Sequence, residues 1–346
     1  MGKHRRVSYL AEQRHAAHLA DLNHDGIPEI AIAGSLFNSV DGSLICRIPP
    51  DRWRSDSVYT TTKVINAAYD INLTNFNQDG RPEIYTWTRI FLIENGAFLC
   101  NGSATDNGLS GVVGCTAVGD MDGDGRPELV AGNRIYKVNI VSPTSSQGNS
   151  LTAMTGGYAY TASLPANIVA DGRTQVADFD LDGSLEVLVV TLSSGKADAY
   201  LWKPVSGGAA QLLGSYLATA TGVAAAGRPL VGNIDADSYP EAVFIANGNP
   251  MLMYALKYDP SAPAGSRLVA KWTLSHTDRS GYTGISLFDF NQNGRNEICF
   301  RDEERLRIIE GSGTAAEELP DSTTSRPARE RKCPSSPMST ATARRS

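Results

Sequence analysis

The sequence predicts an all-β protein built from repeated small sheets. A short acidic pattern recurs along the chain, short strand-like runs lie between its copies, and no long window shows helical periodicity. The six copies begin at residues 21, 75, 120, 178, 233 and 289, a period of about 54 residues. A fixed period of this length is typical of repeat architectures in which each unit forms one small sheet.

The strand-like runs follow the copies in order along the chain. Each copy leads directly into an apolar run, as in EIAIAG after the first, ELVAG after the third and EVLVVTL after the fourth. Further runs are RIFLIENGAFLC, RIYKVNIV, KADAYLWKPV, MLMYALKY and SRLVAKWTL. Three or four short strands fit into each period. Radially repeated antiparallel sheets are the usual arrangement for such a chain, so we predict a β-propeller with about six visible blades.

Composition agrees with an ordinary globular protein and excludes some partners. The chain has 346 residues, 41% of them hydrophobic, and a net charge of −6. We expect no nucleic-acid partner, because such partners attract basic surfaces. No apolar run approaches the roughly 18 residues that a membrane span needs. The basic N-terminus contains no readable signal peptide, because no apolar stretch follows its charges.

Positions 1, 3 and 5 of the pattern are Asp or Asn in every copy, and position 9 is always Glu. Oxygen atoms on alternate residues of a tight loop converge on one ion, and Ca²⁺ takes six to eight oxygen ligands. We therefore predict Ca²⁺ as the cofactor. The predicted ligands are Asp21, Asn23, Asp25 and Glu29 in loop 1; Asn75, Asn77, Asp79 and Glu83 in loop 2; Asp120, Asp122, Asp124 and Glu128 in loop 3; Asp178, Asp180, Asp182 and Glu186 in loop 4; Asn233, Asp235, Asp237 and Glu241 in loop 5; and Asp289, Asn291, Asn293 and Glu297 in loop 6.

The number of carboxylates ranks these loops. Loops 3 and 4 have four each and are expected to hold Ca²⁺ most tightly, whereas loops 2 and 6 have two each and should empty first. Position 6 is Gly in every loop except loop 5, where Ser238 is less suited to a positive φ.

Two other interpretations of the loops are weaker. Asp, Asn and Gly also mark simple turns, but six copies with Glu at one offset disfavour that explanation. An EF-hand needs Glu at position 12 and a following helix, whereas here Glu stands at position 9 before a strand. Zinc and copper are disfavoured because no thiolate or imidazole recurs in the pattern.

The apolar positions 2 and 10 flank each loop and should pin it between packed sheets. At position 2 these are Leu22, Phe76, Met121, Phe179, Ile234 and Phe290. At position 10 they are Ile30, Ile84, Leu129, Val187, Ala242 and Ile298.

Cysteine and histidine supply no alternative chemistry. The five cysteines are odd in number and lack CxxC spacing, which disfavours a disulfide framework, although a Cys100–Cys115 pair within one blade stays open. His15 and His18 lack a third ligand for a metal site.

The chain divides into an N-terminal extension at residues 1–13, the repeats at residues 14–311 and a tail at residues 312–346. The tail has no aromatic residue, Val or Ile, so we expect it to be disordered. Two explanations stay open for it: a natural disordered tail, or a propeller that is truncated or frame-disrupted before a seventh loop.

The loops resemble the FG-GAP repeats of the integrin alpha-chain propeller and the related VCBS-type repeats of bacterial surface proteins. The matching element is Asp-x-Asp-x-Asp-Gly-x-x-Asp/Glu between two strands, from residue 21 to residue 298. The resemblance implies a propeller, usually of seven blades, with Ca²⁺ in its loops and an extracellular or cell-surface location. The FG and GAP motifs are not evident, and Glu at the loop end is closer to the bacterial repeats.

The resemblance implies a role in adhesion, in scaffolding or in display of a surface that binds a protein or polysaccharide. The alternative is a lyase of the rhamnogalacturonan lyase type, since some of these enzymes are similar propellers and fold does not decide function. No residue stands out as a catalytic base, so we predict a binding module rather than an enzyme. The aromatic residues Trp53, Trp87, Trp202, Trp272, Tyr158 and Tyr160 either stack on sugar rings or, as is commoner, pack in the core.

Overall fold

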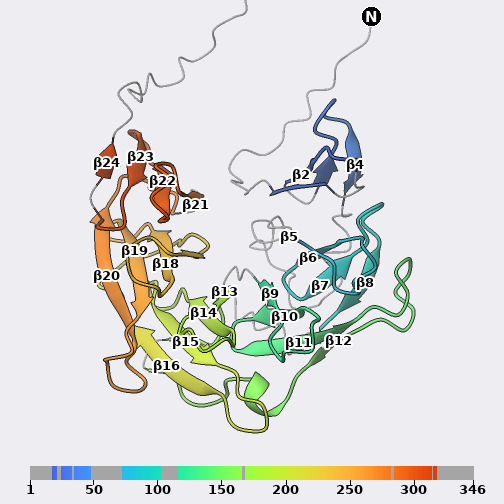
Figure 1. Cartoon of the computed structure of the whole chain (residues 1–346), viewed down its shortest axis with the longest axis horizontal. Helices are drawn as coiled ribbons and strands as arrows, with labels where there is room; N and C mark the ends of the chain where they lie inside the picture. The colour runs from blue at the N-terminus through green and yellow to red at the C-terminus, as the bar shows by residue number, and fades with distance from the viewer. Residues whose placement is uncertain are drawn as a thin grey trace, which may run out of the picture.

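The chain forms a six-bladed β-propeller, as the sequence predicts. The computed structural model describes residues 18–21, 25–32, 35–47, 72–102, 116–165, 168–281, 284–313 and 315–317. Six four-stranded antiparallel sheets follow one another along the chain, and within each sheet the strands are neighbours in sequence order. Figure 1 shows the sheets as an arc with the first and the sixth sheet at its two ends.

Each sheet is an up-and-down meander of short strands. The first holds β1 (His18–Ala20), β2 (Glu29–Ile32), β3 (Ser35–Phe37) and β4 (Leu44–Arg47). The second holds β5 (Asn72–Thr74), β6 (Glu83–Thr86), β7 (Arg89–Phe91) and β8 (Phe98–Asn101). The third holds β9 (Ala117–Gly119), β10 (Glu128–Ala131), β11 (Arg134–Asn139) and β12 (Ser150–Ala153).

The remaining three sheets repeat this plan. The fourth holds β13 (Arg173–Ala177), β14 (Glu186–Val190), β15 (Ala199–Lys203) and β16 (Gln211–Tyr216). The fifth holds β17 (Leu230–Gly232), β18 (Glu241–Ala246), β19 (Leu252–Tyr258) and β20 (Leu268–Ser275). The sixth holds β21 (Ile285–Phe288), β22 (Glu297–Arg301), β23 (Leu306–Ile309) and β24 (Ala315–Glu317).

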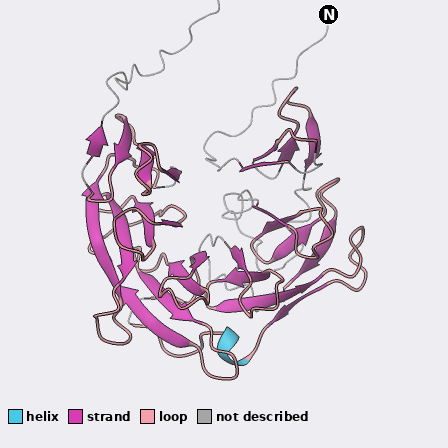
Figure 2. Cartoon of the chain, in the orientation of Figure 1, coloured by secondary structure: helices cyan, strands magenta, loops and turns pink. Residues whose placement is uncertain are grey.

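Helix is almost absent from the described part of the chain, where one short 3₁₀ turn covers Gly156–Tyr158 (Figure 2). Within the same part, no helix is long and apolar enough to cross a bilayer. Strand β24 lies beyond residue 311, where the amino-acid composition places the end of the repeats. Residues 1–17 and 318–346 lie outside the described part, so the predicted extension and tail stay predictions.

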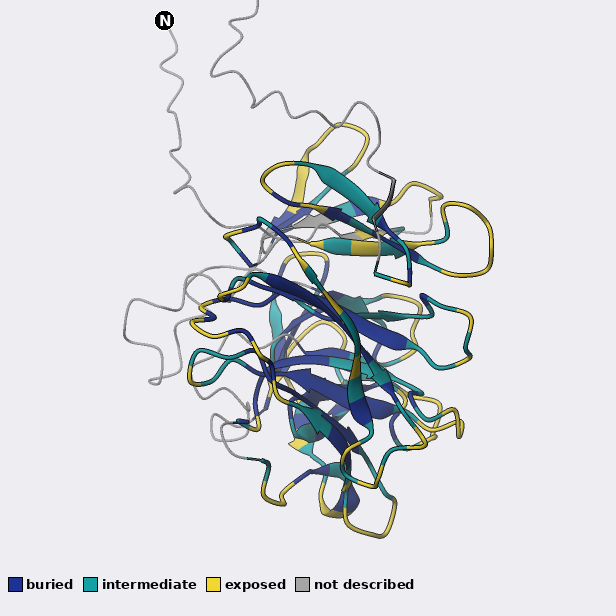
Figure 3. Cartoon of the chain, turned by 90° about the vertical axis from the view of Figure 1, so that its left-hand side faces the viewer, coloured by how far each residue is buried: buried dark blue, intermediate teal, exposed yellow. Residues whose placement is uncertain are grey.

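The hydrophobic core is divided among the contacts between neighbouring sheets. Five clusters of buried residues each join two consecutive sheets, and Figure 3 shows this burial on the strands. In the cluster between the third and fourth sheets, Trp202 and Tyr200 of β15 pack with Val130 and Ile135 of the preceding sheet. A single blade therefore buries its apolar faces only against its neighbours, as expected of a repeat protein.

The two apolar positions that flank each loop serve different interfaces. At position 2, Phe76, Met121, Phe179 and Ile234 are buried in clusters shared with the following sheet. At position 10, Ile84, Leu129, Val187, Ala242 and Ile298 are buried in clusters shared with the preceding sheet. Phe290, at position 2 of the last loop, is 47% exposed. Each inner loop is thus pinned between two cores, as the pattern predicts.

Candidate metal centres

All six acidic loops join the first strand of a sheet to its second strand. Loop 1 connects β1 to β2, and loops 2 to 6 make the equivalent connection in the other sheets. Because the sheets have the same topology, the loops recur at equivalent places along the arc in Figure 1. The repeated pattern in the sequence therefore corresponds to one structural element repeated six times.

A common set of backbone hydrogen bonds shapes the loops. The side-chain Oδ1 of position 5 accepts a hydrogen bond from the backbone N–H of position 7 in every loop, for example from Arg126 to Asp124 at 2.9 Å. In loops 1, 3, 4 and 6, Oδ2 of the first Asp accepts the N–H of the glycine at position 6. Asp and Asn commonly form turns through such local bonds. One oxygen of each of these side chains therefore already accepts a hydrogen bond that stabilises the loop.

Loop 5 departs from this shape. The glycine at position 6 has φ between 84° and 91° in the other five loops, but Ser238 is not among the residues with positive φ. The side chain of Asn233 instead donates to the carbonyl oxygen of Asp237 at 2.7 Å. The expectation that Ser238 avoids the positive φ of the other loops is confirmed.

The glutamate at position 9 is buried in all six loops, with at most 4% of its surface exposed. In loops 2 to 6 its Oε2 accepts the backbone N–H of position 2 at 2.6–3.0 Å. In loops 2 to 5 the glutamate therefore ties the end of its loop to the residue that enters the next interblade core.

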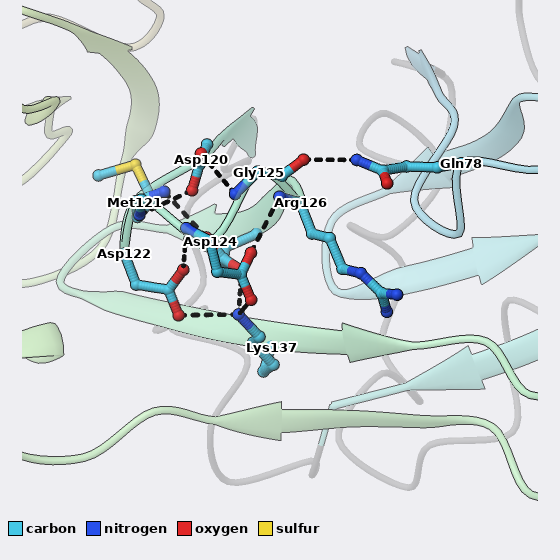
Figure 4. Close-up of polar contacts among 10 residues, drawn as sticks. Gln78, Asp120, Met121, Asp122, Asp124, Gly125, Arg126 and Lys137 are labelled. Carbon is cyan, nitrogen blue, oxygen red and sulfur yellow. Dashed lines mark hydrogen bonds and ion pairs between the residues drawn. The ribbon is translucent and has the colours of Figure 1, made fainter.

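In loop 3, the ammonium group of Lys137 on β11 occupies the centre of the acidic cluster (Figure 4). Its Nζ lies 2.7 Å from Oδ2 of Asp122, 2.5 Å from Oδ2 of Asp124 and 2.9 Å from Oε1 of Glu128. Burial disfavours the charge of Lys137, but hydrogen bonds to the three carboxylates outweigh that effect and raise its pKa. Gln78 of loop 2 also donates to the carbonyl oxygen of Gly125, which links the two loops.

Loop 4 repeats this arrangement with Lys203 of β15. Its Nζ lies 2.7 Å from Oδ2 of Asp180, 2.6 Å from Oδ2 of Asp182 and 2.9 Å from Oε1 of Glu186. The lysine side chain is 13% exposed. Burial again opposes its charge, and the carboxylate contacts again raise its pKa. Loop 4 brings together all four predicted ligands, because one oxygen from each of them lies within 4.8 Å of the others.

Loop 5 brings Asp235, Asp237 and Glu241 together within the same limit. Two lysines contact this loop, each at one carboxylate: Lys257 lies 3.3 Å from Asp237, and Lys271 contacts Asp235. Glu241 is fully buried, and its Oε1 has no hydrogen-bond partner among the described residues. Burial raises the pKa of Glu241 to about 7, since the charged form lacks solvent.

The other three loops have no such cluster within the described residues. In loop 2, Oδ1 of Asn75 is buried without a hydrogen-bond partner, and Asn77 donates to Asp79 at 3.0 Å. In loop 6, the side chain of Asn291 donates to Oε1 of Glu297 at 2.8 Å. Asp21, Asp25 and Glu29 of loop 1 are described, whereas Asn23 lies outside the described residues.

A hard cation fits the donor set of loop 5. The donors are carboxylate oxygens, which Ca²⁺ prefers, and Oε1 of Glu241 is a buried acceptor without a hydrogen-bond donor. A surface hollow of about 610 Å³ opens at this loop, lined by Asp235, Asp237 and Lys271 among others. Solvent can therefore reach Asp235 and Asp237. Within the part of the chain that the structure describes, the acidic clusters of loops 3, 4 and 5 are the groups that could hold a metal ion.

The lysines are the residues that the loop pattern does not predict. They lie outside the pattern. Lys137, Lys203 and Lys257 are on the third strands of the third, fourth and fifth sheets, where Glu241 pairs directly with Lys257, and Lys271 is on the fourth strand of the fifth sheet. Lys137 and Lys203 come one residue after the register pairs Leu129–Tyr136 and Val187–Trp202. The sequence signal for the first three is a lysine in the second strand after loops 3, 4 and 5.

Other residues that the sequence singles out have different roles. Trp202 and Tyr160 are buried between the third and fourth sheets, so the core interpretation holds for these two aromatic residues. Cys46, Cys100 and Cys299 are free thiols, while Cys115 lies outside the described residues. His276 is buried, and His15, like Trp53, is not described.

Comparison with known proteins defines no family for this chain. No protein-family model matches it, and no curated protein matches its sequence. Among solved structures, the biofilm matrix protein Bap1 of V. cholerae aligns over 87% of this chain and 68% of its own, with 14% identity and a TM-score of 0.48. An Agrocybe aegerita lectin that recognises non-reducing terminal N-acetylglucosamine aligns over 86% of this chain and 77% of its own, with 13% identity and a TM-score of 0.46. Likeness at this level assigns no function to the chain.

Proposed function

We propose that the chain is a calcium-binding β-propeller that acts as a binding, adhesion or scaffold module at an extracellular or cell surface. The proposal of calcium binding rests on the buried Oε1 of Glu241. Among the described residues this oxygen has no hydrogen-bond donor, and it lies beside two aspartates in loop 5. A buried carboxylate oxygen without a partner is costly, and a hard cation supplies the missing interaction.

The surface role rests on the loops' resemblance to the FG-GAP and VCBS-type repeats. The proposed partner is a protein or polysaccharide ligand, and the FG-GAP/VCBS membership of the chain is part of the proposal. The loops recur along the arc of sheets, so calcium would order one series of equivalent turns beside the strands.

Thermal unfolding with and without Ca²⁺ tests the proposal of calcium binding. Protein treated with chelator should melt at a lower temperature than protein in excess Ca²⁺, because an ion that binds only the folded state stabilises it by mass action. Mg²⁺ at the same concentration serves as the control for ionic strength. Equal melting temperatures in chelator and in Ca²⁺ would refute the calcium proposal.

The surface role is tested separately by retention of candidate ligands. Immobilised protein is expected to retain a polysaccharide or protein ligand without turnover, and a β-elimination assay on pectic polysaccharide should show no rise in ultraviolet absorbance. A rise in absorbance would establish the lyase alternative in place of the binding module.

A further inference from the structure

We propose that Lys137 and Lys203 are the resident cations of loops 3 and 4, and that these lysines determine which loops take up metal. The inference rests on the proposed calcium function and deepens it. It assigns metal selectivity among the loops to residues that lie outside the acidic pattern.

Two loops of different sequence hold the ammonium group in the same way. In each loop, Nζ contacts the side chains of positions 3, 5 and 9, and the six distances fall between 2.5 and 2.9 Å. Lys137 donates a hydrogen bond to each of its three carboxylates. Lys203 donates one to Asp180 and forms ion pairs with Asp182 and Glu186. In both loops the ammonium group thus lies among three carboxylates.

A lysine ammonium group and a metal ion compete for this position. Ca²⁺ binds oxygen at 2.3–2.6 Å, close to the distances at which Nζ lies from the same atoms. An ammonium group and a Ca²⁺ ion cannot both occupy the space among the three carboxylates, because they would overlap and their charges repel. Metal binding in loop 3 or loop 4 thus requires the lysine side chain to leave.

Loop 5 provides the contrast within the same chain. Lys257 stands directly opposite Glu241 in the strand register, yet its one carboxylate contact is to Asp237 at 3.3 Å. Lys271 of β20 contacts Asp235 instead, and among the described residues no lysine forms an ion pair with Glu241, whereas Lys203 lies 2.9 Å from Oε1 of Glu186 in loop 4. Neither lysine bridges the cluster, and the adjoining hollow is lined by two of its carboxylates, Asp235 and Asp237.

The inference reverses the ranking by charge count. Four carboxylates each rank loops 3 and 4 as the tightest calcium sites. With a resident ammonium group, these loops keep their shape without metal and bind it weakly. Loop 5, with three carboxylates and no bridging lysine, becomes the expected site of first occupancy.

The test compares calcium affinity in Lys203→Met with the unmodified chain by isothermal titration calorimetry after chelator treatment. Methionine keeps much of the side-chain volume and removes the charge. We expect Lys203→Met to gain a calcium site that is at least roughly tenfold tighter, because the ligand charge is no longer neutralised internally. Lys203→Met combined with Asp180→Asn should lose that gain, which assigns it to loop 4.

Two further variants keep the test interpretable. Lys137→Met makes the same change in loop 3, where the side chain is 35% exposed and the substitution is easier to accommodate. Lys196→Met is the matched control, since Lys196 donates to the carbonyl oxygen of Ala218 and contacts no loop carboxylate. Calcium affinities within twofold of the unmodified chain in both lysine variants would overturn the inference.

Failure of the inference is distinguishable from failure of the calcium function. The paired substitution Asp235→Asn with Asp237→Asn in loop 5 reports on the function of the unmodified chain. If this change abolishes a calcium site while Lys203→Met and Lys137→Met gain none, only the inference is wrong. If the unmodified chain binds no Ca²⁺ at all while the lysine variants gain sites, the lysines do control metal uptake and the calcium function of the unmodified chain is wrong.

Discussion

At the scale of single residues, the glutamate at position 9 is the best determined part of each loop. Glu83, for example, is 4% exposed and accepts the backbone N–H of Phe76 at 2.9 Å. The bond fixes the loop whether or not an ion is present. Part of the Asp, Asn and Glu pattern therefore encodes loop structure, and only the remaining oxygens are available to a metal.

Glu83→Ala tests this structural task. In chelator, we expect the free energy of unfolding to fall by about 1–3 kcal/mol, because the buried N–H of Phe76 loses its acceptor. Chemical denaturation gives the value. The control is Glu303→Ala, whose side chain is 49% exposed and lies 3.9 Å from Arg279, with an expected change within about 0.5 kcal/mol. Equal losses in the two variants would show that the buried bond does not stabilise the loop.

His276 makes the stability of the folded chain depend on pH, independently of the acidic loops. Burial lowers its pKa below the usual 6.5, against the opposing effects of backbone carbonyls and of Asp278 and Asp302. Because the folded-state pKa is the lower one, the unfolded chain binds more protons as the pH falls below 6.5. This contribution to stability is complete above that pH and is lost as the pH falls through the folded-state pKa.

We therefore expect the melting temperature to fall more steeply below pH 6.5 in the unmodified chain than in His276→Gln. The difference between the two pH profiles isolates this histidine from the carboxylates, which titrate in both proteins. Parallel profiles would mean that folding does not lower the pKa of His276.

At the scale of the element, each of loops 2 to 5 connects two cores. Its second residue packs against the following sheet and its tenth against the preceding one. Phe179 is fully buried in this way, whereas Phe290 occupies the same position in the last loop and is 47% exposed. The same residue type at the same position thus has a different role according to whether a following sheet covers it.

Replacing Phe179 or Phe290 by alanine should therefore lower the free energy of unfolding by different amounts. Phe179→Ala should lower the free energy of unfolding by about 3–5 kcal/mol, because it removes a fully buried ring and leaves a cavity. Phe290→Ala should change it by about 0.5 kcal/mol or less. Both values come from denaturant unfolding under the same conditions. A large loss in Phe290→Ala would indicate that this ring is covered in solution.

The sequence predicts the loops, the strands that follow them and the apolar flanks because all of these lie within one contiguous pattern. Leu129 and Val187, for example, are assigned to the core by position alone, and both are fully buried. The contacts of Lys137 and Lys203 depend on the register of the next strand, which varies with hairpin length. The sequence pattern of a loop carries no information about that register, so the ammonium groups are found only in the structure.

At the scale of the whole molecule, stability is a chain of neighbour-to-neighbour contacts. The five interblade clusters run in order from the first sheet to the sixth, and the acidic loops sit at the same place in each sheet. Phe288 and Phe290 of the last sheet are 60% and 47% exposed, and Leu19 of the first is 67% exposed. The two ends of the arc are thus less covered than the interior sheets.

Calcium binding is the central claim, and a direct count of bound ions tests it. Equilibrium dialysis of chelator-treated protein against Ca²⁺ should give at least one ion per chain at concentrations up to about 1 mM, the range of extracellular calcium modules. The variant with Asp235→Asn and Asp237→Asn keeps the amide oxygens that shape loop 5 but removes two charges, and it should lose that ion. Absence of bound calcium in the unmodified chain over this range, or a full complement in the loop 5 variant, would contradict the account.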